Sequence, residues 1–269
     1  MLDLILDEFH FSTLWNGGIL IFSMFAAIIY FFLLPTSRKH PLWKSIVFVF
    51  GLIVIFIAVG SPLNVTGRIK FSSHIIQMVL LLLVAPPLLI AGMKSEILER
   101  LKSFAFLERV VDELKRPVTA ILIFQLFFYG YHIPYIFNFA RIDLYLNYFF
   151  LLALFISAII LWIPIMSLKQ LTVEKKWKYT LINIILLIPF SVLLFMSREG
   201  IYAIYSDIEL FMSALALCLP DLTDVPVEFF ASLLPFDPVQ EQKIGAIIFL
   251  VSQVIIFSVG TLVGNKRRK

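Results

Sequence analysis

The sequence predicts an all-α, polytopic membrane protein, a bundle of seven transmembrane helices. Of its 269 residues, 61% are hydrophobic and only 15% are charged, and the mean hydropathy is +0.97. Soluble domains average roughly 45–50% apolar and about 25% charged residues. The charges are also unevenly spread, because long charge-free runs alternate with short charged segments. Barrel strands would alternate in polarity over about ten residues, so these continuous apolar runs favour helices.

Seven runs of the sequence contain no Asp, Glu, Lys or Arg. They cover residues 9–37, 45–67, 71–93, 117–140, 144–168, 179–197 and 244–265. About 20 apolar residues span the hydrocarbon core of a bilayer as a helix, and a spanning backbone must satisfy its own hydrogen bonds. We therefore expect one integral membrane domain over residues 1–269, with spans at about 17–34, 45–60, 73–92, 118–138, 145–166, 180–196 and 244–263.

The distribution of Lys and Arg predicts how the bundle is oriented. Of the 22 basic residues, 17 fall in the segments on one side of the predicted spans and 5 on the other. Cytoplasmic loops carry the excess of Lys and Arg, so the N-terminus is expected outside and the C-terminus in the cytoplasm. The net charge of +4 then reflects topology and gives no support to nucleic-acid binding.

Residues 198–243, between the sixth and seventh spans, are predicted to form a long outer loop. Its apolar part, residues 201–219, contains Asp207 and Glu209, and an Asp at a helix centre costs about 2.5–3.5 kcal/mol on insertion. Four prolines in the loop prevent it from forming one helix. We expect an interfacial or re-entrant piece here and no eighth span.

Two histidines are predicted to lie near the same outer boundary. His74 opens the third span, which runs inward, and His132 closes the fourth, which runs outward. Met78 follows His74 by four residues, so it lies on the same helix face one turn deeper. Neutral imidazole and thioether are ligands that suit Cu(I). His74, Met78 and His132 are therefore a candidate Cu(I) site, which Met196 at the outer end of the sixth span would extend.

A second interpretation of these residues needs no metal. Met78 lies in an apolar run where methionine usually packs, and a histidine at a helix end often bonds only a backbone group or water. Proline patterns are equally open, since Pro134 after His132 either shapes a cavity or serves packing alone.

The sequence lacks the motifs of several other functions. One cysteine, Cys218, and scattered histidines make no zinc or iron–sulfur cluster. No glycine-rich phosphate loop, Gly-x-Ser-x-Gly elbow or His-Glu-x-x-His helix occurs, so we expect no enzyme. A copper or small-molecule transporter is the alternative function, although it has few mid-membrane polar groups to form a path, chiefly Gln125, Asn183 and Gln253.

Several short motifs stand in an order that resembles a known family. They are Ser61-Pro62-Leu63-Asn64, Ser72-Ser73-His74-Ile75-Ile76-Gln77-Met78, Ala85-Pro86-Pro87-Leu88-Leu89, Arg116-Pro117, His132-Ile133-Pro134, Trp162-Ile163-Pro164 and Glu241-Gln242-Lys243-Ile244-Gly245. From about residue 58 to 260 the chain resembles a divergent member of the CtaG-type cytochrome c oxidase assembly factors.

The resemblance implies a non-enzymatic role in maturing a caa-type cytochrome c oxidase, with help to copper insertion at the outer membrane face. It also implies a multi-pass protein of the bacterial cell membrane that contacts membrane lipids and oxidase subunits. The family usually has His-x-x-x-His where this chain has His74-x-x-x-Met78. Either the site is retuned toward softer Cu(I) ligation, or metal binding is lost and a scaffold role remains.

Two assemblies are expected for the chain, a direct complex with the oxidase and a homo-oligomer. Gly260 and Gly264 in the last span are spaced as Gly-x-x-x-Gly, which permits close contact between helices. The homo-oligomer would use that face.

Overall fold

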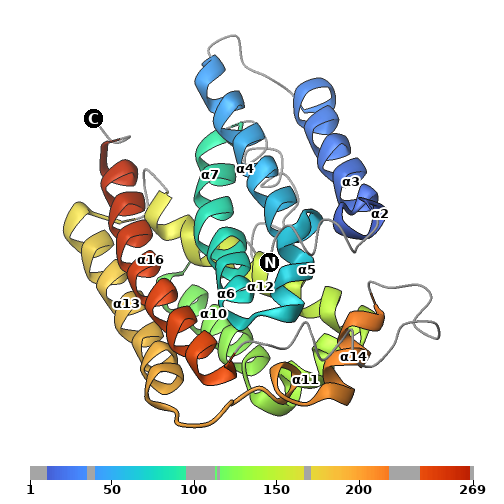
Figure 1. Cartoon of the computed structure of the whole chain (residues 1–269). Helices are drawn as coiled ribbons and strands as arrows, with labels where there is room; N and C mark the ends of the chain where they lie inside the picture. The colour runs from blue at the N-terminus through green and yellow to red at the C-terminus, as the bar shows by residue number, and fades with distance from the viewer. Residues whose placement is uncertain are drawn as a thin grey trace.

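The computed structural model describes residues 11–34, 40–94, 113, 116–166, 171–217 and 237–266. Throughout these ranges every regular element is helical and no strand occurs, which confirms the all-α class. The helices run side by side as a bundle, with α3 beside α4 at one edge and α13 beside α16 at the other (Figure 1).

The helices follow one another along the chain with short connections in the described ranges. In order they are α2 (Phe11–Leu14), α3 (Gly17–Ile28), η1 (Ile29–Leu33), α4 (Leu42–Gly60), α5 (Pro62–Ile69), α6 (Phe71–Met78), η2 (Val79–Val84), α7 (Ala85–Gly92), α10 (Pro117–Tyr131), α11 (Pro134–Ile142), α12 (Leu144–Met166), α13 (Val173–Met196), η3 (Ala203–Tyr205), α14 (Ile208–Ala216) and α16 (Pro238–Lys266). α6, η2 and α7 form one long helix, of which η2 is a π-helical part.

Five of these helices are long and apolar enough to cross a membrane. They are Leu42–Gly60, Phe71–Gly92, Leu144–Met166, Val173–Met196 and Pro238–Lys266. α10 with α11 is a sixth candidate, and α3 with η1 forms a shorter apolar helix, Gly17–Leu33. Each predicted span therefore coincides with a helix or a bent helix pair. The count of seven crossings and the orientation stay predictions.

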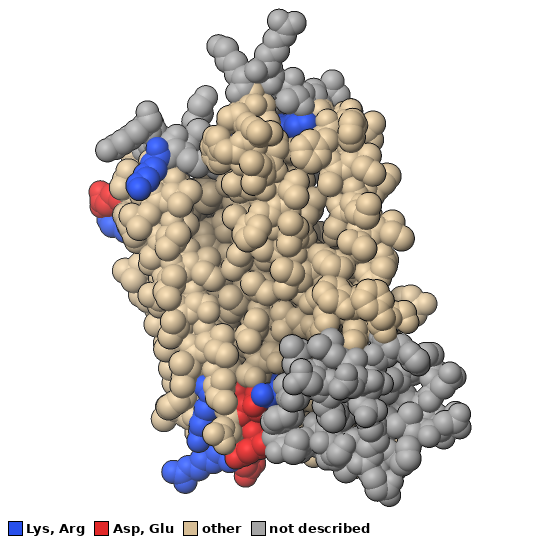
Figure 2. Space-filling model, turned by 45° about the horizontal axis from the view of Figure 1, so that its top comes forward, with Lys and Arg blue, Asp and Glu red and all other residues tan. Residues whose placement is uncertain are grey.

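The surface of the bundle has the character that a membrane requires. In the view of Figure 2, Lys, Arg, Asp and Glu gather toward two opposite ends, and the belt between them carries no charge. Large apolar side chains such as Phe32 and Leu126 are exposed on the outside of the helices. Such a surface is stable against lipid chains and would be costly in water. The protein is a polytopic membrane protein.

The fourth predicted span, residues 118–138, is not a single straight helix. α10 ends at Tyr131, α11 begins at Pro134, and their axes differ by 73°. Pro134 has no backbone N–H, and Ile133 before it is extended at φ −61° and ψ 126°, as the clash with a following proline ring favours. His132 therefore lies at a sharp bend at one end of the bundle.

The prolines of the third span leave a backbone carbonyl without its helical donor, and α12 supplies one. Pro86 and Pro87 follow Leu82 by four and five residues, the positions whose N–H groups would donate to the Leu82 carbonyl in an α-helix and in a π-helix. Neither proline has an N–H group. The indole Nε1 of Trp162 donates to that carbonyl at 3.1 Å. Membrane helices tolerate proline where a neighbour satisfies the freed carbonyl, so this bond fixes α12 against the third span.

The Gly-x-x-x-Gly pair of the last span is used inside the chain. A Cβ at Gly260 would lie 2.4 Å from Cζ3 of Trp162, and one at Gly264 would lie 2.4 Å from the carbonyl oxygen of Ile165. Both glycines therefore let α16 approach α12 closely. The predicted close helix contact is present, but its partner is α12 of the same chain and not a second copy.

The predicted outer loop contains a short helix in its described part. α14 has nine residues, about 14 Å of helix at 1.5 Å per residue, too short to cross a bilayer. Asp207 caps it, accepting from the backbone N–H groups of Glu209 and Leu210. A helix of this length is no eighth span, but the interfacial position expected for residues 201–219 stays a prediction. Residues 218–236 of the loop lie outside the described ranges.

Candidate metal site at the outer end of the bundle

The structure brings the two predicted histidines together. His74 lies in the first turn of α6 and His132 directly follows α10, and both side chains are buried. Their ring centroids are 6.1 Å apart. A metal bound at about 2 Å to one nitrogen of each ring tolerates centroid distances of up to roughly 6 Å. We call His74 and His132 the histidine pair, and the end of the bundle that contains it the outer end.

The ring nitrogens of the histidine pair are mostly without hydrogen-bond partners. Nδ1 of His132 lies 2.7 Å from the carbonyl oxygen of Phe128, and it must carry the proton to donate there. Nε2 of His132 then holds the lone pair, and it has no partner; nor has either nitrogen of His74. A histidine held by a backbone carbonyl through one nitrogen, with the other available, is the usual arrangement of a metal ligand.

Aromatic rings enclose the histidine pair. Phe137 of α11 lies 5.1 Å from the His74 ring, and Phe128 and Phe190 lie 4.5 Å and 4.6 Å from the His132 ring, all measured between centroids. Polar atoms buried among apolar rings without partners cost free energy. The unpartnered nitrogens therefore indicate a site that a ligand or ordered water completes.

The two methionines named from the sequence lie in different surroundings. Met78 is fully buried in the core of the bundle, one turn below His74 on α6. Met196, which we expected to extend the site, is 73% exposed at the end of α13. It faces away from the bundle and does not join the histidine pair. The set His74, Met78 and His132 remains a prediction, with all three residues buried.

No cluster of conventional metal ligands accompanies the histidine pair. The described part of the chain contains no group of three or more His, Cys, Asp or Glu side chains that could hold a metal ion. A metal here would rely on the two imidazoles and on a softer ligand such as a thioether. That donor set fits Cu(I) better than Zn²⁺ or Mg²⁺.

Residues of the predicted motifs hold α6 in place beneath His74. The side-chain amide of Gln77 donates to the carbonyl oxygen of Ala58 at 2.9 Å and to Oδ1 of Asn64 at 3.0 Å. Ser61 caps α5, accepting from the N–H of Leu63 at 3.2 Å. These contacts connect α4, α5 and α6, so they fix where the helix turn that carries His74 lies.

The start of α16 fixes the other side of α6. Glu241 pairs with Nζ of Lys70 at 3.0 Å and accepts a hydrogen bond from Ser72. At Gly245 a Cβ would lie 3.1 Å from Ile75 and 3.2 Å from Phe71, so the glycine allows α16 to lie close to α6. The Glu241–Gly245 motif thus packs the last helix next to the turn of His74.

Two arginines that the sequence places in outer loops are buried beside this site. Arg68 in α5 and Arg141 in α11 are 3% and 0% exposed. Nη1 of Arg68 donates to the carbonyl oxygen of Arg141 at 2.9 Å, and Nη2 of Arg141 donates to that of Gly67. Reasoning from charge counts missed them, because it treats every loop cation as solvated. The sequence signal for their burial was their position in short helices that begin with proline. For Arg141, Phe137 four residues earlier adds to that signal.

Two tyrosines of the segment after α13 cover the site from the outside. The Tyr202 hydroxyl donates to the carbonyl oxygen of His132 at 3.1 Å, and the Tyr205 hydroxyl donates to that of Gly67 at 2.8 Å. Burial raises the pKa of both phenols above the ordinary value. Both therefore stay protonated and donate at any physiological pH, which keeps the cover in place.

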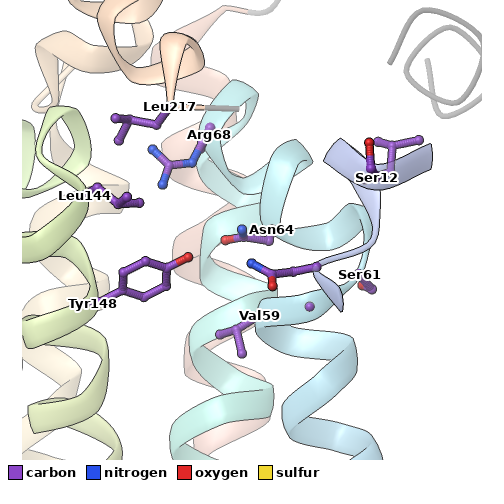
Figure 3. Close-up of a pocket in the computed structure, with 11 residues that line it drawn as sticks. Ser12, Val59, Ser61, Asn64, Arg68, Leu144, Tyr148 and Leu217 are labelled. Atoms are coloured by element: carbon purple, nitrogen blue, oxygen red, sulfur yellow. The ribbon is translucent and has the colours of Figure 1, made fainter. Parts of the chain in front are cut away.

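A polar pocket of about 200 Å³ lies at the same end of the bundle. Figure 3 shows Arg68 and Asn64 of α5 facing Tyr148 of α12 across it, with Leu217 above. Asn64 accepts the hydrogen bond from Gln77, three residues after His74. The hydrogen bond from Gln77 to Asn64 therefore connects the α5 wall of the pocket to α6, the helix that carries His74.

Comparisons with known proteins show which family the chain resembles. None of the curated proteins and none of the solved structures matches the chain. Residues 28–264 match the family described as cytochrome c oxidase caa3 assembly factor (Caa3_CtaG). That range includes all the motifs that carry the predicted resemblance, both histidines and both buried arginines. The chain belongs to the family of cytochrome c oxidase caa3 assembly factors.

Proposed function

We propose that this protein is a maturation factor for a caa-type cytochrome c oxidase that assists copper insertion at the outer face of the bacterial cell membrane. Copper is the cargo in this proposal and the oxidase subunits are the partners. Membership of the assembly-factor family supports a role that is not catalytic. The family match does not favour the alternative of a copper or small-molecule transporter.

One observation carries the copper part of the proposal. His74 and His132 come from different helices, yet their rings lie 6.1 Å apart with three of four nitrogens unpartnered. Two neutral imidazoles with a nearby thioether suit a monovalent, soft ion. Under this proposal the pair holds Cu(I) at the outer end, and Met78 lies one helical turn deeper as the third ligand.

The enclosure of the histidine pair gives the proposed site its selectivity. Burial among aromatic rings excludes the hydration shell that hard ions such as Mg²⁺ retain. The described residues provide no group of three or more His, Cys, Asp or Glu side chains for a metal, which favours an ion that accepts low coordination. Delivery to an oxidase subunit then requires the cover formed by Tyr202 and Tyr205 to open, since their hydroxyls bond the backbone on either side of the site.

The proposal is tested by loading the purified protein with Cu(I) under reducing conditions and measuring retained copper. We expect about one equivalent on the wild type and none on a His74→Ala/His132→Ala double variant. His40→Ala is the matched control, because His40 lies at the opposite end of the bundle near Tyr30 and should leave retention unchanged.

Two outcomes would contradict the copper role. One is a wild type that retains no copper, and the other is retention that the double variant does not reduce. In cells that lack the protein, oxidase activity should fall and oxidase spectra should be disturbed. Normal respiration in such cells would contradict the assembly role itself.

A further inference from the structure

The guanidinium of Arg141 is a buried positive charge with most of its donors unused. Its side chain is 0% exposed, and its Nη2 donates a hydrogen bond to the carbonyl oxygen of Gly67. Nε and Nη1 have no hydrogen-bond partner. A guanidinium can donate five hydrogen bonds, and three of these N–H groups lie on the unpartnered Nε and Nη1 of Arg141.

No carboxylate neutralises Arg141 within the part of the chain that the structure describes. The ion pairs there join Lys70 to Glu241, Arg116 to Glu113 and Lys178 to Glu174. A buried charge without a counter-charge is strongly destabilising, and in membrane proteins such residues are usually functional. Among the described residues, Arg141 therefore has no anionic partner.

Arg141 lies beside Phe137, a ring that also contacts both members of the histidine pair. Its guanidinium carbon is 5.9 Å from the centre of the Phe137 ring, and that ring is 5.1 Å from His74 and 6.2 Å from His132. Gly67, whose carbonyl oxygen accepts from Arg141, also lies against His74, because a Cβ at Gly67 would be 3.4 Å from Cα of His74. Tyr131, whose ring is 5.3 Å from Phe137, has a hydroxyl without a partner. The unused polar atoms of four side chains thus gather around one phenylalanine.

This arrangement opposes the binding of a bare cation. Cu(I) held by two neutral imidazoles keeps its full positive charge, and the buried guanidinium would repel it in a medium of low dielectric constant. An anion between the copper ion and the guanidinium would attract both cations, and it would accept hydrogen bonds from the unused N–H groups of Arg141. A soft anion fits best, because Cu(I) prefers soft ligands.

We propose that Arg141 holds an anionic co-ligand, a thiolate or a halide, against the Cu(I) bound by His74 and His132. The inference rests on the proposed copper site and adds the class of its third partner. A thiolate from an oxidase subunit would complete the site during transfer, and a halide would complete it between transfers. No covalent or redox step is involved.

The experiment uses X-ray absorption at the copper edge on the Cu(I)-loaded full chain in bromide buffer, with nitrate at equal ionic strength as reference. A Cys218→Ser background removes the thiol of the chain itself. We expect a bromine neighbour of copper in the wild-type background and in Arg141→Lys, which keeps the charge. Arg141→Gln should lose that neighbour.

Lys176→Gln is the matched control, because Lys176 is also 0% exposed but lies in the first turn of α13, at the opposite end of the bundle, where its Nζ donates to the carbonyl oxygen of Gly264. It should keep the bromine neighbour. Copper with no bromine in the wild-type background, or bromine unchanged in Arg141→Gln, overturns the inference and leaves the copper site standing. Absence of copper from the wild type would reject both. The wild-type spectrum alone decides the first outcome, so the inference can be tested even if a variant fails to fold.

Discussion

Tyr202 and Tyr205 both donate to backbone carbonyls around the histidine pair, but the two carbonyls differ in what else they bind. The Gly67 carbonyl accepts from Tyr205 and also from Arg141. The His132 carbonyl accepts from Tyr202, at the bend where the regular helical bonds of α10 have ended. We therefore expect the two hydroxyl groups to contribute unequally to the stability of the cover.

We predict that Tyr202→Phe destabilises the protein more than Tyr205→Phe does. Removing the Tyr202 hydroxyl leaves a buried carbonyl unpaired, at a cost of about 1–3 kcal/mol, whereas Gly67 keeps Arg141 and loses about 0.5–1.5 kcal/mol. Thermal unfolding of both variants in the same detergent measures the difference. Equal effects, or a larger one for Tyr205→Phe, would contradict this account of the cover.

At the scale of elements, helix packing in this bundle depends on single glycines and prolines. Gly264 allows α16 to touch the backbone of α12. Trp162 of α12 donates a hydrogen bond to the Leu82 carbonyl, which Pro86 and Pro87 leave without a helical donor. The sequence predicted both the Gly-x-x-x-Gly contact and the proline kinks. It did not predict their partners, because which helix lies opposite a small residue depends on the packing of all the others.

Gly264→Ala should destabilise the protein, because its methyl group would lie 2.4 Å from the carbonyl oxygen of Ile165. A backbone atom cannot rotate away, so overpacking should cost about 1–3 kcal/mol. Gly130→Ala is the control, since nothing lies within 4 Å of its added Cβ and helical alanine is favoured by up to about 1 kcal/mol. Unfolding in detergent compares the two.

The same pair of variants separates intramolecular packing from self-association. If Gly264 served a homo-oligomer, its alanine variant would dissociate the complex while the monomer kept its stability. Size measurements on the variant alongside the unfolding data would show such a result, and it would contradict the packing of α16 on α12.

For the whole molecule, the charge distribution predicts which end faces the cytoplasm. Lys178 lies near the start of α13 and Glu209 lies in α14, beyond the other end of α13, and both are exposed. α13 has 24 residues, about 36 Å of helix, enough to separate the two by a bilayer. The excess of Lys and Arg on the Lys178 side predicts that this side faces the cytoplasm.

In a Cys218→Ser background, Glu209→Cys should react with a membrane-impermeant maleimide on intact cells. Lys178→Cys should react only after the cells are permeabilised. Labelling of Lys178→Cys alone on intact cells would invert the orientation, and the histidine pair would then face the cytoplasm. That result would remove the basis for copper delivery at the outer face.

As with the fold, some features of the candidate site were predictable from the sequence and others were not. His74 and His132 were predictable together, because alternating directions of consecutive spans place the start of one beside the end of the next. The 73° bend at Pro134 was only partly predictable, since proline indicates a break but not its angle. The burial of Arg141 was not predictable, because it depends on α11 folding back over the bundle and on Tyr205 and Phe137 covering it.

The sequence by itself determined that the chain is helical, that it lies in a membrane, where its apolar helices run and which family it belongs to. The first three follow from local composition, since a bilayer selects charge-free segments of about 20 residues one at a time. The family follows from the order of short motifs along the chain. Only the tertiary structure decided that α16 packs on α12, that Met196 faces outward and that two guanidiniums lie beside two imidazoles. Those outcomes depend on contacts between helices far apart in sequence, where close packing and the pairing of buried polar groups apply to all the helices at once.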